Sequence, residues 1–408
     1  MNHERREKHE IRGKGLVPRL RFPEFRDAGG WAIKPLRKIL SIGNGKDHKH
    51  LPDGDVPVYG SGGYMRSVND YLYDGESVCI GRKGTIDKPA FLNGKFWAVD
   101  TLFYTHSFRN TIPRFVFALF QNIEWLKHNE AGGVPSLSKT NIAKIEVAIP
   151  ETKEQQKIAD CLSSLDALIA AQADKIDALK THKKGLMQQL FPREGETIPR
   201  LRFPEFRDAG GWEERRLGEK DVASFVKKRI SLNELDIESY VSTENLLPDF
   251  EGKKRASKLP PSGSFTSFNP ADILVANIRP YLKKVWVADS YGAASNDVVV
   301  IRPMDNIRGS FLSALLKNDA FIHYVMEGAK GVKMPRGDVS LIKEYPLAVP
   351  GPDEQQKIAD CLSSLDTLIA AQSEKLDALK THKKGLMQQL FPMQKQADCS
   401  RIIIHANH

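Results

Sequence analysis

The chain has 408 residues, enough for two or three domains that each bury a hydrophobic core. Hydrophobic residues make up 41% of it and charged residues 27%, as is ordinary for a soluble protein, and no run of about 18 apolar residues is present that could form a transmembrane helix. The formal net charge of +9 favours a polyanionic partner such as nucleic acid, but a ribosome-associated, membrane-surface or simply basic protein would carry the same excess.

The N-terminal segment and the cysteines bear on the cellular compartment. The first ten residues, MNHERREKHE, lack the apolar region of a signal peptide. The four cysteines (Cys79, Cys161, Cys361 and Cys399) have neither the spacing of a zinc site nor that of a disulfide framework. We therefore expect a cytoplasmic protein with no metal site and no membrane association.

Two segments of the sequence occur twice. The first, PRLRFPEFRDAGGW, spans Pro18–Trp31 and recurs at Pro199–Trp212 with all 14 positions identical. The second spans Glu154–Pro192 and recurs at Glu354–Pro392 with four differences in 39 positions. The period of roughly 200 residues is far longer than the about 20–50 residues of stacked repeats, so the sequence indicates a two-domain duplication with pseudo-twofold character.

The repeats divide the chain into six predicted segments. In chain order they are an N-terminal extension (1–17), a first module with its lead-in segment (18–150), a central helical spacer (151–192), a second module with its lead-in segment (193–350), a C-terminal helical spacer (351–392) and a tail (393–408). The two modules differ over most of their length, but Pro135 and Pro150 of the first recur as Pro335 and Pro350 of the second. We therefore expect one fold with two divergent surfaces.

Each module contains short β-prone runs separated by Gly, Asn and Asp turns, followed by a helical stretch. In the first module the runs are VPVYGSGGYM, SVCIGRKGTI and KFWAVDTLFY, and the helical stretch is 114–127. In the second they are SYVSTENLL, DILVANIRPYL, KKVWVA and NDVVVIRP, and the helical stretch is 309–327. This pattern predicts two similar mixed α/β modules.

The longer repeat has the pattern of a coiled-coil helix. Its apolar positions are spaced alternately by four and three residues, which predicts a continuous helix of about 55 Å from Glu154 to Leu190 and a second one from Glu354 to Leu390. An internal twofold axis perpendicular to the helices would pair them as an antiparallel coiled coil. The predicted apolar seam consists of Ile158, Leu162, Leu165, Ile169, Ile176, Leu179 and Leu186 in the first copy and Ile358, Leu362, Leu365, Ile369, Leu376, Leu379 and Leu386 in the second.

Some seam positions are polar, namely Gln172 and Lys183 with their copies Gln372 and Lys383. Either they set the register and pairing of the helices, or they lie at frayed or partner-covered points. An alternative for the whole block is a surface helix packed on its own domain, although 37 residues is long for such a helix. If the helices pair, they hold the two modules at a fixed spacing.

Basic turns follow an apolar run in both modules. Arginine pairs with guanine, asparagine with adenine and lysine with phosphate, so such turns are candidates for DNA contact. The alternative is a solvated basic hairpin. The candidate contact residues are Lys46, Tyr59, Ser61, Arg82, Lys83 and Thr85 in the first module and Asn277, Arg279, Tyr281, Lys283, Lys284, Lys333 and Arg336 in the second.

Motifs of catalysis are missing from the sequence. There is no P-loop, GxSxG, HExxH or amino-methyltransferase motif, and the glycine-rich GSGG and GNGK stretches do not continue into a nucleotide-binding pattern. We therefore expect no catalytic residues, no metal ligands and no cofactor in this chain.

The order of these segments resembles the specificity subunit of type I restriction–modification complexes. The resemblance rests on the RLRFPEF…W lead-in, the IGRKGTI and GGVPSLS stretches, and the EQQKIAD…KKGLMQQLFP helix, and it covers Pro18 to Pro392. It implies two target recognition domains (32–150 and 213–350) that each read one half of an asymmetric bipartite site in double-stranded DNA. It further implies two modification subunits that methylate adenine N6 with S-adenosylmethionine, and restriction motor-nuclease subunits that use ATP and Mg²⁺. The chain itself would be non-catalytic.

Two other functions compete with this one. A fused restriction–modification enzyme would need methyltransferase motifs, for which two modules in 408 residues leave no room. A coiled-coil scaffold with two protein-binding modules would show no affinity for DNA and partner binding that is insensitive to salt.

Overall fold

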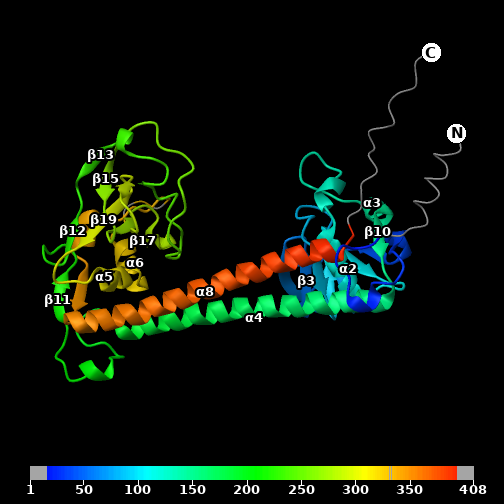
Figure 1. Cartoon of the computed structure of the whole chain (residues 1–408), viewed down its shortest axis with the longest axis horizontal. Helices are drawn as coiled ribbons and strands as arrows, with labels where there is room; N and C mark the ends of the chain where they lie inside the picture. Colours follow the sequence, from blue (N-terminus) through cyan, green and yellow to red (C-terminus); the bar gives the residue numbers. More distant parts are fainter. Residues whose placement is uncertain (1–15, 330, 332, 393–408) are drawn as a thin grey trace, which may run out of the picture. The chain divides into compact units, whose positions relative to one another are not determined.

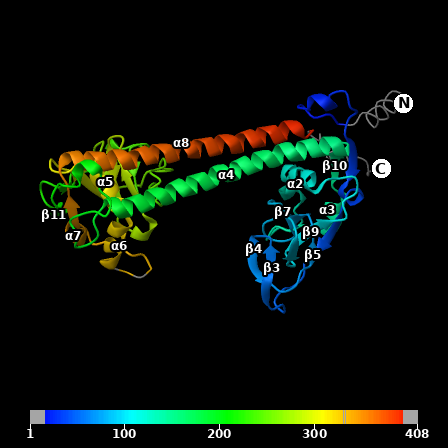
Figure 2. The ribbon, with the colours of Figure 1, turned by 90° about the horizontal axis from the view of Figure 1, so that it is seen from below.

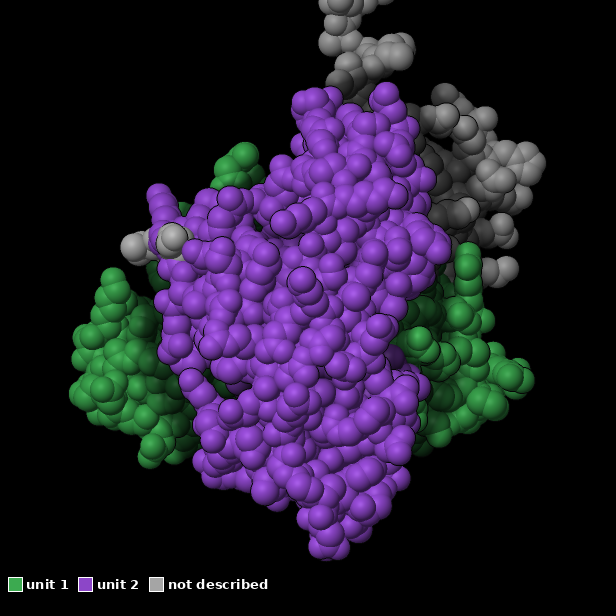
Figure 3. All heavy atoms as spheres, turned by 90° about the vertical axis from the view of Figure 1, so that its left-hand side faces the viewer, with its two compact units in different colours: residues 1–173, 374–408 green, residues 174–373 purple. Residues whose placement is uncertain are grey.

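The computed structural model describes residues 16–329, 331 and 333–392, so the predicted tail and most of the predicted N-terminal extension lie outside the described residues. The chain forms two compact units (Figure 1). Unit 1 comprises residues 1–173 and 374–408, and unit 2 comprises residues 174–373; Figure 3 colours them green and purple. Each unit therefore holds one module, together with half of each long helix. None of the helices in the described residues combines the length and apolar character needed to cross a membrane.

Unit 1 contains three small sheets. Its strands are β1 (Ala32–Pro35), β2 (Ser41–Asn44), β3 (Asp53–Gly60), β4 (Gly63–Val68), β5 (Tyr73–Asp74), β6 (Ser77–Gly81), β7 (Ala90–Leu92), β8 (Lys95–Ala98), β9 (Leu102–His106) and β10 (Glu146–Ile149). One sheet has the order β2-β9-β6-β7, a second has the order β4-β3-β8-β5, and β1 pairs with β10. The helices are α2 (Pro113–Asn122), which packs on β6 and β7, and α3 (Lys139–Lys144); short 3-10 turns lie at Pro23–Phe25, Leu36–Lys38 and Trp125–His128.

Unit 2 repeats part of this arrangement. Its strands are β11 (Glu213–Arg216), β12 (Ala223–Phe225), β13 (Arg229–Ser231), β14 (Tyr240–Val241), β15 (Ser264–Phe268), β16 (Ile273–Ala276), β17 (Val285–Val287), β18 (Gly292–Ala294), β19 (Val298–Pro303) and β20 (Pro346–Val349). Its helices are α5 (Gly309–Leu316), α6 (Asp319–Glu327) and α7 (Val339–Lys343), with 3-10 turns at Pro204–Phe206, Leu232–Glu234 and Pro280–Leu282.

The two modules share one sheet and differ in another. The order β12-β19-β16-β17 matches β2-β9-β6-β7 strand for strand, and β11 pairs with β20 as β1 does with β10. The remaining sheet, β13-β15-β18-β14, connects its strands in a different order from β4-β3-β8-β5. The prediction of similar mixed α/β modules is confirmed, and the divergence lies mainly in this remaining sheet.

Two long helices follow the modules. They are α4 (Thr152–Leu190) and α8 (Pro352–Leu390), which begin two residues before the predicted starts and end at the predicted leucines. In unit 1 the second half of α8 lies beside the first half of α4, as Figures 1 and 2 both show. All fourteen predicted apolar seam residues are buried or half-buried, as the heptad pattern requires.

Lysine–aspartate pairs fix the direction of this packing. The ammonium of Lys383 lies 2.5 Å from Asp166 in unit 1, and that of Lys183 lies 2.5 Å from Asp366 in unit 2. The second pair is the first with the two repeats exchanged, which is the relation expected of an antiparallel pair with internal twofold symmetry. The antiparallel coiled coil is therefore confirmed within each unit, and the two polar lysines of the seam hold its register.

The 14-residue lead-in segment packs on the start of a long helix. In unit 1, the guanidinium of Arg21 donates to both carboxylate oxygens of Glu154, at 2.8 and 2.7 Å, and both side chains are buried. In unit 2, Arg202 donates to Glu354 in the same way, at 2.8 Å twice. These bidentate pairs explain why the lead-in and the helix start recur together.

The next residue of each helix binds the loop before the first module helix. Gln155 accepts from the amide of Ile112 at 3.0 Å and donates to the carbonyl of Pro150 at 2.9 Å. Gln355 likewise accepts from the amide of Arg308 at 2.8 Å and donates to Pro350 at 2.9 Å. The Glu-Gln pair at each helix start thus anchors both the lead-in and the module.

Each core combines a module with both long helices. In unit 1, Trp31 and Phe115 pack on Phe391 at the end of α8, with ring centroids 5.9 and 5.5 Å apart. Ile158 and Leu162 of α4 complete this core. In unit 2, Phe191 at the end of α4 meets Trp212 and Phe311 in the same way. The predicted alternative, a helix packed only on its own domain, is wrong, because each module packs on halves of both helices.

Candidate nucleic-acid interface

The basic turn of unit 1 follows a fully buried strand. All five residues of β6 are buried, since Val78 and Ile80 belong to the main core of unit 1 and Cys79 belongs to a second hydrophobic cluster. The chain then leaves the sheet at Arg82 and returns at Ala90, where β7 pairs back onto β6. A short apolar strand therefore places the turn 82–89 at the edge of a rigid sheet. The turn of unit 2, residues 277–284, joins β16 to β17 in the same position.

A second loop holds each turn from outside. In unit 1 the amide of Gly84 donates to the carbonyl of Pro135 at 2.9 Å, and the amide of Leu137 donates to the carbonyl of Arg82 at 2.9 Å. In unit 2 the amide of Arg279 donates to Pro335 at 2.8 Å, and that of Gly337 donates to Asn277 at 2.9 Å. The proline loops of the two modules thus pair with the basic turns. The contacts also set the correspondence between them: Arg82 matches Asn277, and Gly84 matches Arg279.

The backbone of both turns is left-handed at the same point. Gly84 has φ of +90° and Arg279 has φ of +53°. Glycine adopts this conformation freely, whereas an arginine in it is strained and is held there by its surroundings. Such residues concentrate at binding sites, so the conformation of Arg279 supports its choice as a contact residue.

The predicted contact residues of unit 1 gather around the turn. Arg82 and Lys83 are exposed on it and Thr85 is half-buried. A methyl group built on Gly84 would lie 3.3 Å from the hydroxyl of Ser61, so the β3–β4 hairpin tip lies beside the turn. Tyr59 is half-buried near the end of β3, and the exposed Lys46 follows β2, where its carbonyl accepts from the indole of Trp97 at 2.9 Å.

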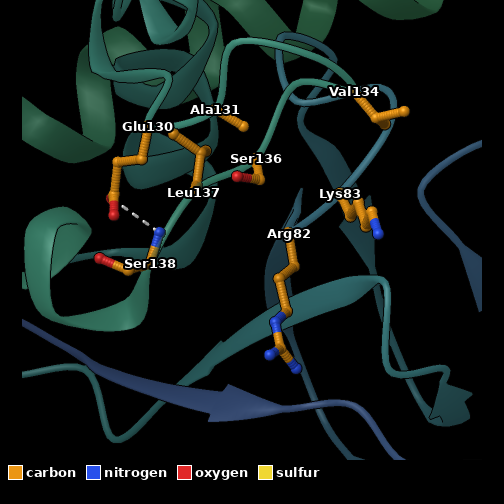
Figure 4. Close-up of a pocket in the computed structure, with 8 residues that line it drawn as sticks. All are labelled: Arg82, Lys83, Glu130, Ala131, Val134, Ser136, Leu137 and Ser138. Carbon is orange, nitrogen blue, oxygen red and sulfur yellow. Dashed lines mark hydrogen bonds between the residues drawn. The ribbon is translucent and has the colours of Figure 1, made fainter.

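A pocket lies between the turn and the proline loop of unit 1. It has a volume of about 520 Å³ and is lined by Arg82 and Lys83 of the turn and by Glu130, Ala131, Val134 and residues 136–138 of the proline loop (Figure 4). Arg82 and Lys83 extend in different directions in this view, while Glu130 accepts from the backbone amide of Ser138 at 3.0 Å. The carboxylate is thus occupied within its own loop, and both cations face solvent.

The predicted residues of unit 2 divide into two groups. Arg279, Tyr281, Lys333 and Arg336 are exposed around the turn, with Arg336 paired to Asp297. Asn277, by contrast, is only 6% exposed, because its side chain lies beneath the proline loop against Gly337. Its burial argues against direct contact with a base, and we withdraw it from the set.

The two lysines of the unit 2 turn are engaged internally. Lys283 donates to Asp319 at 2.7 Å, and Lys284 donates to the carbonyl of Thr243 at 2.6 Å. Burial lowers the pKa of Lys284 from its ordinary value, with a further lowering by the nearby Lys254 and Arg279. Both lysines are also half-buried, whereas Arg279, Lys333 and Arg336 are exposed, so these three are the better candidates for contact with a partner.

Sequence reasoning missed two exposed aromatic residues in loops of the modules. Tyr64 is 62% exposed on the β3–β4 hairpin, and its ring lies 6.1 Å from that of Tyr59. Tyr291 is 73% exposed in the loop between β17 and β18, at the end of β17 that lies away from the basic turn. The signal for them in the sequence was an aromatic residue next to a glycine turn.

In the described residues, no group of three or more His, Cys, Asp or Glu side chains is placed to hold a metal ion.

Replacing Gly81 tests how rigidly the backbone holds the turn, without changing the charge of the turn. A Cβ at this position would lie 1.9 Å from the carbonyl oxygen of Thr85, so Gly81→Ala forces the backbone to move. We expect it to destabilise unit 1 by about 1–3 kcal/mol, measured by thermal unfolding. Gly62→Ala is the control, because nothing lies within 4 Å of a Cβ there. Equal stability of the two variants would show that the turn is not rigid.

Comparison with known proteins places this arrangement in a family. The family model described as the type I restriction modification DNA specificity domain matches the chain twice, over residues 29–181 and 210–381. The EcoDI specificity subunit of Escherichia coli is 22% identical over 363 residues, which cover 80% of this chain and 79% of that protein. The MjaVIII specificity subunit of Methanocaldococcus jannaschii is 23% identical over 348 residues, covering 78% and 77%.

A solved structure supports the fold. The S subunit of a type I restriction–modification system from M. genitalium has a TM-score of 0.60 at 15% identity, over 93% of this chain and 100% of that one. The two matches to the family model each cover one module and most of the helix that follows it. Together they span most of the sequence, and the chain therefore belongs to the family of type I restriction–modification specificity subunits, which recognise DNA sequence within their complex.

Proposed function

We propose that the two modules read two different half-sites of one asymmetric bipartite DNA sequence, and that α4 and α8 set the spacing between them. The observation that carries this proposal is the pair of equivalent turns, which are built by the same backbone hydrogen bonds but present different side chains. Sequence is read by side chains at base edges in the major groove, so two equivalent turns with different residues read different bases.

The contact residues of the proposal follow from exposure. In unit 1 they are the exposed Arg82, Lys83 and Lys46, with the half-buried Ser61, Tyr59 and Thr85 as secondary candidates. In unit 2 they are Arg279, Tyr281, Lys333 and Arg336. Arginine can form a bidentate pair with guanine, whereas the exposed lysines suit phosphates. Together these cations also account for part of the excess positive charge of the chain.

The partners of the proposal are double-stranded DNA and the other subunits of a type I complex. Two modification subunits would bind the repeated elements of the chain, one at each copy. They would methylate adenine with S-adenosylmethionine after flipping the base out of the duplex. Restriction motor-nuclease subunits would use ATP and Mg²⁺. In this proposal none of these cofactors belongs to the present chain, whose part is to position the other subunits on the site.

Mapping adenine methylation tests the proposal directly. The chain would be expressed together with its modification subunit, and modified adenines would be located across the genome of the host. An asymmetric pair of short motifs with a fixed, unread gap is the expected result. Methylation of a single continuous motif, or none that depends on this chain, would refute it.

Arginine substitutions assign the half-sites to the modules. Arg82→Ala should weaken recognition of one half-site by about 5- to 150-fold, because the loss of a bidentate contact with a base costs about 1–3 kcal/mol. Arg279→Ala should do the same at the other half-site. Binding would be measured on duplexes in which one half-site at a time is scrambled. Equal losses at both half-sites, or none at either, would contradict the assignment.

A further inference from the structure

A lysine-rich segment near the end of each long helix has the same sequence in both copies but a different environment. The segment THKKGLMQQLFP occurs at 181–192 and again at 381–392, and a further lysine precedes it at Lys180 and Lys380. The first copy belongs to unit 2 and the second to unit 1. Any difference between them therefore comes from the module that each copy packs against.

In unit 2 each of the three lysines of this segment lies within 4 Å of a carboxylate. Lys180 lies 3.4 Å from Glu251, Lys183 lies 2.5 Å from Asp366, and Lys184 lies 2.8 Å from Asp319. Asp319 also accepts from Lys283 of the basic turn at 2.7 Å. These two ammonium groups hold the pKa of Asp319 below its ordinary value. The second module thus supplies the counter-ions of Lys180 and Lys184, and α8 supplies that of Lys183.

Among the described residues of unit 1, only one of the three equivalent lysines lies within 4 Å of a carboxylate from another segment of the chain. Lys383 pairs with Asp166 at 2.5 Å. The nearest carboxylate to Lys380 is Asp377, at 4.0 Å on the same helix. In the part of the chain that the structure describes, no carboxylate lies within 4 Å of the ammonium of Lys384 or of Lys88, the lysine contributed by the unit 1 turn.

The missing carboxylate can be traced to one position. Gln121 at the end of α2 lies 3.4 Å from Lys383, in the place where Lys317 after α5 lies near Lys183 and Asp366. Asn122 then corresponds to Asn318, and Ile123 corresponds to Asp319. An isoleucine therefore stands where unit 2 has the acid that binds two lysines. Unit 1 retains the two lysines, Lys384 and Lys88, but lacks the carboxylate that would pair with them.

These lysines line an open pocket. It has a volume of about 490 Å³, and Lys88, Lys380, Lys383 and Lys384 all border it, with Asp87 as the single acid among the lining residues. Lys380 and Lys384 are four residues apart and so lie on one face of the helix. The ammonium groups of these lysines repel one another, and a bound anion would offset this repulsion.

We propose that this lysine pocket of unit 1 binds a backbone phosphate of DNA that flanks the half-site read by unit 1. A phosphate there would replace the carboxylate that Asp319 supplies in unit 2. DNA is favoured over an acidic protein because Lys88 belongs to the same 82–89 turn as Arg82 and Lys83, which are proposed to contact DNA. The inference rests on the proposed function and extends the DNA footprint onto the helix.

Matched substitutions in the two copies test the proposal. The full-length chain, assembled with its modification subunits, would be titrated with a duplex carrying its site between 50 and 200 mM salt. Lys380→Ala with Lys384→Ala should reduce the slope of log K against log salt by about 0.9, the amount expected for the loss of one phosphate contact. Lys180→Ala with Lys184→Ala should leave the slope unchanged, because those lysines are already neutralised.

Controls separate this inference from loss of folding and from failure of the proposed function. The charge-preserving pair Lys380→Arg with Lys384→Arg should retain the wild-type slope, and both alanine pairs should leave the ratio of specific to non-specific binding unchanged. An unchanged slope in the Lys380/Lys384 alanine pair, or an equal change in both alanine pairs, overturns the lysine pocket while the wild-type site preference stands.

Two further outcomes have separate meanings. If the Lys380/Lys384 alanine pair instead loses its modification subunit at an unchanged DNA slope, the pocket binds protein and the DNA proposal is overturned. If the wild-type complex shows no preference for a bipartite site, the proposed function fails first, and the lysine pocket, which rests on it, fails with it.

Discussion

Duplicating one heptad in each long helix is expected to abolish methylation of the native site and to create a preference for a longer one. The duplicated residues would be 169–175 in α4 and 369–375 in α8, which preserves the four-three spacing of the seam. Seven helical residues add about 10.5 Å to each helix, the length of about three base pairs at 3.4 Å each. The new site should keep both half-sites and gain about three unread base pairs.

A series of duplexes that differ only in spacer length would measure this change, either by binding or by methylation. The control is the same duplication in α4 alone. The Lys183–Asp366 and Lys383–Asp166 pairs require the two helices to keep one register, so a single insertion should lower thermal stability without producing a new preferred spacer. An unchanged spacer preference in the doubly extended chain would refute the idea that the helices measure the gap.

Replacing either buried arginine of the lead-in by alanine is expected to destabilise its unit by about 3–5 kcal/mol, because it leaves a buried carboxylate without its partner. The side chains of Arg21 and Glu154 are 7% and 3% exposed, and those of Arg202 and Glu354 have the same values. Thermal or urea unfolding would measure the loss. The exposed neighbours Arg19 and Arg200 are matched controls, and their alanine variants should change stability by less than about 0.5 kcal/mol.

The two arginine variants should not be equal. After Arg21→Ala, Glu154 still accepts from the indole of Trp31 at 3.2 Å. The corresponding indole of Trp212 makes no hydrogen bond within the described residues, so Arg202→Ala leaves Glu354 with no side-chain donor there. We therefore expect the larger loss in unit 2. Replacing both members of one pair by apolar residues of similar size should restore most of the stability, and a failure to do so would show that the pair is needed for more than charge compensation.

Much of the architecture follows from local patterns in the sequence. The four-three spacing of apolar residues was sufficient to predict both long helices, since a heptad repeat has its meaning within a single segment. The identical copies of the lead-in and the nearly identical copies of the helix were sufficient to predict the twofold relation. The strands before the basic turns were also predictable, because an apolar run such as SVCIG, followed by glycine and charges, marks a buried strand and its end.

The extent of the helical stretches was less predictable. The predicted helix 309–327 is two helices, α5 and α6, which are separated at Lys317 and Asn318. The side chain of Asn318 accepts from the amide of Ala320 and starts the second helix. An asparagine can cap a helix or sit within one, and only its surroundings decide between the two.

The sequence by itself determined the duplicated frame, two modules and two paired helices, because repeats and periodicities are properties of one segment read alone. The tertiary structure decided which side chains each module presents. Asn277 was a predicted contact residue, but a loop about 60 residues further along the chain covers its side chain. The equivalent loop of unit 1 makes the same backbone contacts and leaves Arg82 exposed. The identical lysines of the two helices likewise differ in their partners, because Asp319 binds Lys184 in unit 2 whereas the aligned residue of unit 1, Ile123, has no carboxylate. Such differences arise from contacts between segments far apart in sequence, for which the sequence carries no local signal.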